Sequence, residues 1–444
     1  MPNNTFDASP FAARRTQLLQ RMGQGIAIIT TAPERLRNQD SHYPYRFDSH
    51  FYYLTGFTEP EAVLVLQAEP ARAILFCRPR HPEREIWDGF RHGPEMAQSR
   101  FGFDAAYSIE ELDQRLPELL ANQSVMHYAL GADMTWDRRI LRWLNTVREQ
   151  TRSGVRAPHR IQDIREPLSA MRRIKDETER MLMRHAADIS CRAHRRAMLA
   201  ARPGLSEYAI EAELLYEFRR HGAQAPAYTS IVAGGLNACT LHYVGNAAPL
   251  RDGDLLLIDA GCEFDGYAAD ITRTFPVNGL FSAPQRDVYA CVLAAQAAAL
   301  DRVRPGAGWN EPHDAAVRVL AQGMLDWGLL KGSLDGVIES GDYKQFYMHR
   351  TGHWLGLDVH DVGAYKQDNG DWCSLEAGMT LTVEPGCYIR PDDNIPTAFH
   401  GIGIRIEDDV CVTANGLDIL TAAAPKSIDD IENLMREQQH AFAQ

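Results

Sequence analysis

Residues 255–276 read LLLIDAGCEFDGYAADITRTFP, and this segment decides the fold of the second part of the chain. The apolar run Leu255–Ile258 predicts a buried strand that ends at Asp259. A second strand is predicted over Tyr267–Phe275. Between them lies Asp265-Gly266, a hairpin signal because a tight two-residue turn requires positive φ. The segment therefore predicts an antiparallel β-hairpin.

This hairpin places two acidic side chains together. With a two-residue loop, Phe264 pairs with Tyr267, and Asp259 becomes the diagonal neighbour of Asp270 on the same face. Two ionised carboxylates side by side on a mostly buried sheet repel each other and are poorly solvated. Such a pair usually requires a cation.

A second acidic pair occurs later in the chain in a similar setting. Glu384 follows the predicted strand Met379–Val383, and Pro385-Gly386 ends that strand at once. Glu407 lies in Gly401–Val412, a segment that alternates like a strand. Taken alone, each of these acids would more often be a solvated strand end or half of an ion pair.

The two acidic pairs belong to a weak internal repeat. One predicted helix ends at Arg202-Pro203-Gly204, and another, over 284–303, ends at Arg304-Pro305-Gly306. In each half a glycine, Gly253 or Gly378, then stands six residues before the first acid. These helix ends, glycines and acids recur in one order at an interval of about one hundred residues, which indicates two related αβ halves.

Three histidines, His349, His353 and His360, lie within twelve residues of glycine-punctuated sequence. The spacing of the first two matches a helical zinc motif, but no glutamate follows His349, and Gly352 and Gly356 disfavour a helix. Taken alone, this segment could equally contain buried core histidines whose hydrogen bonds are satisfied. Their clustering in strand-like sequence favours a site.

Four carboxylates and one imidazole form an oxygen-rich ligand set, which suits two hard or borderline divalent ions. Manganese or cobalt is favoured over structural zinc, and the four negative charges balance two dications. Two such ions about 3.5–4 Å apart can share a hydroxide and polarise a carbonyl. The set therefore predicts hydrolytic chemistry.

With these residues in place, the sequence resembles the pita-bread metallopeptidases, and within them the aminopeptidase P family. The resemblance covers nearly the whole chain and rests on several motifs. They are Tyr43-Pro44-Tyr45-Arg46, Tyr53-Leu54-Thr55-Gly56-Phe57, Leu241-His242-Tyr243, Ile258–Gly266, Asp270–Pro276, His353–Gly363, Glu384-Pro385-Gly386 and Gly401–Asp408.

The resemblance implies a role for each residue of the site. The metal ligands would be Asp259, Asp270, His353, Glu384 and Glu407. Glu384 would accept a proton from a metal-bridging hydroxide, His360 would stabilise the tetrahedral intermediate, and His242 would act beside them. The substrate cleft would be lined by His242, His349, His360 and Arg405. The implied ions are two per chain, manganese first, with cobalt or zinc as alternatives.

The implied fold is α+β: an N-terminal ribonuclease-H-like αβ domain over 1–172 and a pseudo-symmetric pita-bread catalytic domain over 173–444. A helix start at Asp176, with capping-box spacing to Glu179, supports a boundary near residue 172. Relatives of this type are homotetramers whose N-terminal domains wall off neighbouring active sites, so we expect a homo-oligomer, tetramer or dimer. Asp40 and Trp87 lie where such walls originate, although ordinary surface or core roles fit them equally well.

Composition limits the partners. The formal net charge of −13 argues against nucleic acid or an anionic membrane, and no run reaches the ~18 apolar residues of a membrane span. Arg14, Arg15 and Arg21 interrupt any signal-peptide core, so we expect a cytoplasmic protein. None of the eight cysteines forms a Cys-x-x-Cys pair, which predicts reduced, structural thiols.

The expected substrates are peptides with proline at the second position. The nearest alternative is a prolidase, which shares the fold and metals but accepts only dipeptides; the ungapped span from Asp270 to His353 and the N-terminal domain favour aminopeptidase P. A metal-free pita-bread binding module, or metal-free hydrolysis of the creatinase type, is disfavoured by the intact ligand set. One departure is visible: Arg350 stands where relatives carry a small residue, and it either alters a subsite or faces solvent.

Overall fold

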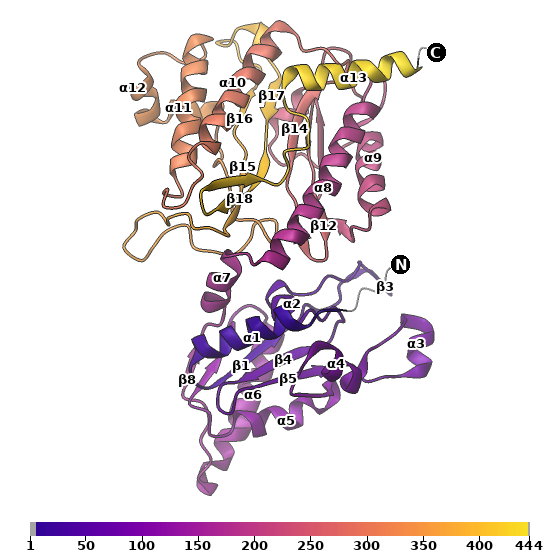
Figure 1. Ribbon diagram of the computed structural model, residues 1–444, viewed down its shortest axis with the longest axis vertical. Helices are drawn as coiled ribbons and strands as arrows, with labels where there is room; N and C mark the ends of the chain where they lie inside the picture. The colour runs from indigo at the N-terminus through magenta and orange to yellow at the C-terminus, as the bar shows by residue number, and fades with distance from the viewer. Residues whose placement is uncertain (1–5, 443–444) are drawn as a thin grey trace. The chain divides into compact units, whose positions relative to one another are not determined.

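The structure is a computed structural model that describes residues 6–442. It divides into two compact units, with the division between Met171 and Arg172 (Figure 1). Among the described residues, no helix is both long and apolar enough to cross a bilayer.

A six-stranded mixed sheet forms the centre of the first unit, in the order β6-β5-β4-β1-β7-β8. The strands are β1 (Ile26–Thr30), β4 (Val63–Gln67), β5 (Arg72–Cys77), β6 (Ala105–Ser108), β7 (Val125–His127) and β8 (Arg160–Gln162). The pairs β1–β4 and β4–β5 are antiparallel, and the outer pairs are parallel. The central strands β1 and β4 are buried along nearly their whole length, and α1 (Ser9–Met22) and α2 (Ser49–Thr55) contact them.

Helices α5 (Leu112–Leu120) and α6 (Met134–Arg148) share one hydrophobic core with β1, β4 and β5. Other helices of this unit are α1 (Ser9–Met22), α2 (Ser49–Thr55) and α4 (Gly93–Phe101). The short helix α3 (Pro82–Asp88) contains no buried residue, and Trp87 on it is 85% exposed. A small hairpin of β2 (Leu36–Asn38) and β3 (Ser41–His42) holds the exposed Asp40 in its turn.

In the second unit, two pairs of packed helices accompany the sheets. The first pair is α8 (Glu177–Ala200) with α9 (Glu207–Arg220), and the second is α10 (Ala283–Leu300) with α11 (Glu311–Asp326). Helix α8 begins with a capping box in which Asp176 and Glu179 satisfy each other's backbone N–H groups, as the sequence predicts. The remaining helices are α7 (Arg165–Arg173), which crosses the division, α12 (Leu334–Ser340) and α13 (Ile428–Phe442).

Equivalent antiparallel pairs supply the centre of each half, β11–β14 in the first and β15–β18 in the second. The strands are β9 (Ala225–Pro226), β10 (Ile231–Gly234), β11 (Leu255–Asp259), β12 (Cys262–Phe264), β13 (Tyr267–Ala268), β14 (Thr272–Pro276), β15 (Thr380–Val383), β16 (Gly386–Ile389), β17 (Ile402–Arg405), β18 (Asp408–Thr413) and β19 (Gly416–Ile419). Gly253 and Gly378, which precede β11 and β15, both have positive φ, of 82° and 94°. The halves meet where the Glu407 N–H donates to the Thr272 carbonyl, at 3.1 Å.

The predicted hairpin register is confirmed. Phe264 pairs with Tyr267, and Asp265 and Gly266 have φ of 46° and 82°. Asp259 pairs with Thr272 in the same register, which leaves Asp270 diagonal to it. The single strand predicted over Tyr267–Phe275 is wrong, because the structure has two strands there, β13 and β14, which belong to different sheets. Gly261 is required here, because a Cβ at that position would lie 1.7 Å from the Ala269 carbonyl oxygen.

The predicted single strand over Gly401–Val412 is wrong in one respect. The structure has two strands there, β17 and β18, and they pair with different partners, β16 and β15. Ile406 and Glu407 form the junction between them. The chain changes sheets at this point, so the alternating pattern continues although the pairing does not.

Candidate metal centre and substrate cleft

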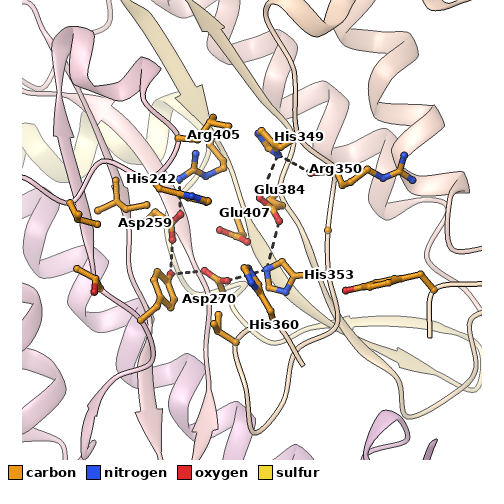
Figure 2. Close-up of a pocket in the computed structure, with 18 of the residues that line it drawn as sticks. His242, Asp259, Asp270, His349, Arg350, His353, His360, Glu384, Arg405 and Glu407 are labelled. Carbon is orange, nitrogen blue, oxygen red and sulfur yellow. Dashed lines mark hydrogen bonds and ion pairs between the residues drawn. The ribbon is translucent and has the colours of Figure 1, made fainter. Parts of the chain in front are cut away.

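One cavity of about 710 Å³ in the second unit holds the whole predicted site (Figure 2). Its lining includes all nine residues singled out from the sequence: His242, Asp259, Asp270, His349, His353, His360, Glu384, Arg405 and Glu407. They come from β11, β17, the ends of β14, β15 and β18, and the loops between elements. Residues more than a hundred positions apart in the sequence therefore meet in one place.

Asp270, His353 and Glu407 form the tightest cluster, with one ligand atom from each within 4.8 Å of the others. Asp270 lies two residues before β14, and Glu407 immediately precedes β18. The backbone N–H of Asp270 donates to Asp409 Oδ2 at 2.9 Å, and Glu407 Oε2 accepts from the Thr272 hydroxyl at 2.7 Å. Each acid is therefore held by the half to which the other belongs.

His353 lies on a segment that runs alongside β15. Backbone bonds join Thr382 N–H to the His353 carbonyl and Glu384 N–H to the Thr351 carbonyl, at 3.0 and 2.8 Å. Close contact explains Gly352, because a Cβ there would lie 2.1 Å from the Thr382 carbonyl oxygen. Paired in this way, the segment aims the His353 ring at Asp270 (3.3 Å) and Glu384 (3.7 Å).

The two remaining acids flank this cluster. Asp259 shares the Tyr228 hydroxyl with Asp270, at 2.6 and 2.5 Å, and Glu384 lies on the side of His349 and His353. Figure 2 shows the four carboxylates directed toward a common centre.

Burial and mutual repulsion set the electrostatics of the cluster. Burial raises the pKa of Glu384 to about 7 and raises the pKa values of Asp259 and Glu407. Burial would also raise the pKa of Asp270, but the hydrogen bond from His353 lowers it. Burial would lower the pKa of His353, yet Asp270 and Glu384 raise it to about 9. The protein alone thus offsets four buried negative charges only partly.

The donor set fits divalent cations. Four carboxylates and one imidazole converge in a buried space, where burial raises the pKa values of three of the carboxyl groups and ionised carboxylates are costly without positive charge nearby. Oxygen donors with a single imidazole suit manganese, cobalt or zinc in a site of mixed hardness.

The three other histidines surround this centre. The His360 ring packs edge-on against His353, with ring centroids 4.3 Å apart. His349 Nε2 lies 2.8 Å from the Tyr388 hydroxyl, and burial together with Arg405 lowers the pKa of His349 to about 3. His242 is exposed on the opposite wall. All three line the same cavity as the carboxylates.

Arg405 lies beside Asp259 and is 4% exposed. Its guanidinium donates to Asp259 Oδ2 at 2.6 Å, to the Tyr388 hydroxyl at 2.9 Å and to the Thr272 hydroxyl at 3.0 Å. Such a network fixes the orientation of Asp259.

Sequence reasoning missed Tyr228, Thr272 and Tyr388, which hold the charged groups in place. A signal existed for Thr272, because the predicted register pairs it with Asp259. Tyr228 and Tyr388 carry no local pattern that separates them from ordinary buried tyrosines.

Family comparison agrees with this geometry. Residues 181–414 match the model of metallopeptidase family M24, and residues 11–128 match the aminopeptidase P N-terminal domain. The chain is 48% identical to the Xaa-Pro aminopeptidase of Haemophilus influenzae over 428 residues, 96% of either protein.

Solved structures give the same result. The Pseudomonas aeruginosa aminopeptidase PepP superposes with a TM-score of 0.96 at 50% identity, covering 98% of this chain and 99% of that one. Escherichia coli aminopeptidase P with the inhibitor Pro-Leu gives a TM-score of 0.95 at 44% identity, covering 98% and 100%. With the cluster of acids and His353 in the matched region, the chain belongs to metallopeptidase family M24 and carries the N-terminal domain of its aminopeptidase P members.

Proposed function

We propose that the chain is a cytoplasmic two-metal aminopeptidase that releases the N-terminal residue from peptides with proline at the second position. The convergence of Asp259, Asp270, His353, Glu384 and Glu407 in one cavity carries this proposal. Similarity to Xaa-Pro aminopeptidases over 96% of the chain supports the substrate class and does not favour a prolidase.

These five residues would hold the two ions, with Asp259 and Asp270 contributed by one half and His353, Glu384 and Glu407 by the other. When bound, a pair of divalent ions supplies a hydroxide near neutral pH and polarises the scissile carbonyl. Manganese suits the oxygen-rich donors best, with cobalt or zinc as alternatives.

Protein side chains would transfer the proton, stabilise the developing charge and position the peptide. Glu384 would accept the proton from the nucleophile, since its carboxylate faces the centre of the site. His360, beside His353, would donate to the oxygen that gains charge, and His242 would assist on the opposite wall. His349 and Arg405, joined through Tyr388, would position the peptide and Asp259.

Proline at the second position fits this arrangement. A bond to proline lacks an N–H, and the ring fixes the chain direction. A site that holds the free α-amine and the carbonyl oxygen has no need of that N–H and leaves space for the ring. The trans isomer is required, because a cis bond directs the rest of the chain elsewhere.

We further propose that the residues before and after the boundary near 172 act as an N-terminal domain and a catalytic domain, and that copies of the chain associate as a tetramer or dimer. Trp87 and Asp40, both exposed, lie in the region of the first domain from which such contacts would come. Nucleic acid and membranes are not expected partners of a chain with a net charge of −13.

The test uses protein stripped with a chelator and reloaded with manganese, cobalt or zinc. We expect cleavage of the first bond of Xaa-Pro-Yaa tripeptides and loss of activity in the stripped protein. The Xaa-Ala-Yaa analogues and N-acetylated peptides should resist.

Three results would contradict this proposal. Equal rates on the proline and alanine tripeptides would indicate a general aminopeptidase, and cleavage confined to Xaa-Pro dipeptides a prolidase. Full activity in protein shown by elemental analysis to contain no metal would exclude the two-metal assignment.

A further inference from the structure

A small hairpin and Arg350 form one rim of the substrate cleft. The backbone pairs Tyr365 with Cys373, Lys366 with Trp372 and Gln367 with Asp371. Tyr365 and Trp372 line the cleft, and Tyr365 stacks on Trp354 with ring centroids 5.7 Å apart and planes within 6°. The hairpin is thus anchored to the segment that carries His353.

Two cations contact the indole of Trp372. The Arg350 guanidinium lies 5.2 Å from its ring centroid, and the Lys366 ammonium lies 4.6 Å away. Arg350 also donates to Asn310, the residue that precedes α11. Its long side chain therefore has a defined place at the rim, held by an aromatic face and an amide, although it is exposed.

Charge distinguishes Arg350 from the rest of the lining. The cleft contains two guanidinium groups, and the other, on Arg405, is neutralised by Asp259 at 2.6 Å. Among the residues whose side chains the structure describes, neither Arg350 nor Lys366 forms an ion pair, although Asp368 and Asp371 lie in the same hairpin. A cation fixed at the edge of an otherwise acidic cleft is suited to an anion supplied by the substrate.

The position of Arg350 indicates which part of a peptide would supply that anion. Figure 2 shows its side chain directed away from Glu384 and the other carboxylates. The α-amine and the scissile bond belong at the carboxylate cluster, so a group at the rim lies further along the peptide. Carboxylate is the only anion of an unmodified peptide at neutral pH.

We propose that Arg350, supported by Trp372 and Lys366, binds a carboxylate of the peptide beyond the cleaved bond. This inference rests on the aminopeptidase function proposed above. The carboxylate is either the C-terminus of a short substrate or an acidic side chain of a longer one. Arg350 therefore sets a preference among peptides that all have proline at the second position.

The experiment compares pairs of substrates that differ by one charge. One series has Xaa-Pro peptides of three to five residues with a free C-terminus or a C-terminal amide. A second series, all amidated, has Glu or Gln at the third, fourth or fifth position. The wild type should prefer the charged member of a pair by about 5- to 10-fold in kcat/KM, the scale of a partly exposed charge-assisted contact. The preference should shrink at high salt.

Two variants test the residue. Arg350→Ala should bring the charged-to-neutral ratio close to one, and Arg350→Glu should reverse it. Arg318→Ala, which removes an exposed guanidinium of α11, is the matched control and should retain the wild-type ratio. Calorimetric titration of metal-loaded protein with Pro-Leu and Pro-Leu-amide gives the same comparison without turnover.

The two series separate the sources of the carboxylate, since a preference confined to one of them assigns that source. A ratio that survives in Arg350→Ala, or a preference that depends only on an acidic first residue, would overturn the proposal. Failure of the underlying function has a different signature, because the wild type would then cleave neither member of any pair.

Discussion

At the scale of single residues, the Tyr228 hydroxyl joins the two acids of the first hairpin. It lies 2.6 Å from Asp259 and 2.5 Å from Asp270, but it has only one proton to donate. Its geometric effect is to hold the two carboxylates at a fixed separation. Substitution of a residue that orients metal ligands usually changes the metal affinity more than it changes the fold.

We therefore expect Tyr228→Phe to weaken metal binding by about 10- to 100-fold, because the carboxylates lose the group that orients them. Calorimetric titration of the stripped protein with manganese measures the change. Tyr208→Phe, at an exposed position on α9, is the control. Equal affinity in the wild type and Tyr228→Phe would show that the bond is incidental.

His360 tests a different role at the same scale. If it stabilises developing negative charge, His360→Ala should lower kcat by about 10²–10³-fold, the usual effect of losing one such donor. The metal content should stay at the wild-type value, as elemental analysis can show. His159→Ala, an exposed histidine of the first unit, should keep full activity. Loss of metal from His360→Ala would instead make His360 a ligand or the support of one.

At the scale of elements, a buried ion cluster fixes the loop that carries His360. Asp361 accepts from Arg172 at 2.5 Å and from Lys175 at 2.8 Å, and all three side chains are nearly inaccessible to solvent. The Asp361 N–H also donates to the Trp354 carbonyl at 2.8 Å, closing the loop on itself. Burial would raise the pKa of Asp361, but Lys175 and Arg172 lower it below its ordinary value.

Replacing Asp361 by Asn should destabilise the protein by about 3–5 kcal/mol, because the buried Lys175 loses its carboxylate partner and Arg172 keeps only the pair with Asp358. Since the folded-state pKa is depressed, the stabilisation is present above the ordinary carboxyl pKa of about 3.9 and is lost as pH falls through the lower folded value. Urea unfolding at a series of pH values measures the gap between wild type and variant. The difference in the free energy of unfolding should have its full value at pH 6 and disappear in strong acid. A difference that does not change with pH would contradict the electrostatic origin.

Local chemistry explains which elements the sequence could predict. Asp265-Gly266 determined the hairpin register, and Asp176 with Glu179 determined the start of α8, because turns and caps depend on a few adjacent residues. The exchange of partners between β17 and β18 is set by distant strands, so alternation alone could not show it.

The same limit applies to the site. Its charged residues were predictable because acidic pairs recur in both halves and match the aminopeptidase P motifs, whereas Tyr228 lies 31 and 42 residues from the carboxylates it contacts. The cluster of Asp361 with Arg172 and Lys175 joins positions 186 to 189 residues apart. No pattern within a short window carries such information.

At the scale of the whole molecule, α3 presents its apolar side chains to solvent. Ile86 and Trp87 are 82% and 85% exposed, and no residue of this helix is buried. If copies of the chain associate through this helix, Trp87→Ser should shift the protein toward smaller species, as sedimentation velocity can measure. Leu141→Ser, at a half-exposed position on α6, is the control. An unchanged distribution in Trp87→Ser would place the contact elsewhere.

The division of the acids between two halves also sets an order of events during synthesis. Asp259 and Asp270 leave the ribosome with the first half, long before Glu384 and Glu407 exist. Until β18 has been made, Thr272 lacks the Glu407 N–H that joins the halves. The nascent chain therefore carries an incomplete acidic hairpin while residues 271–406 are being added, and its ligand set is complete only after Glu407 has been made.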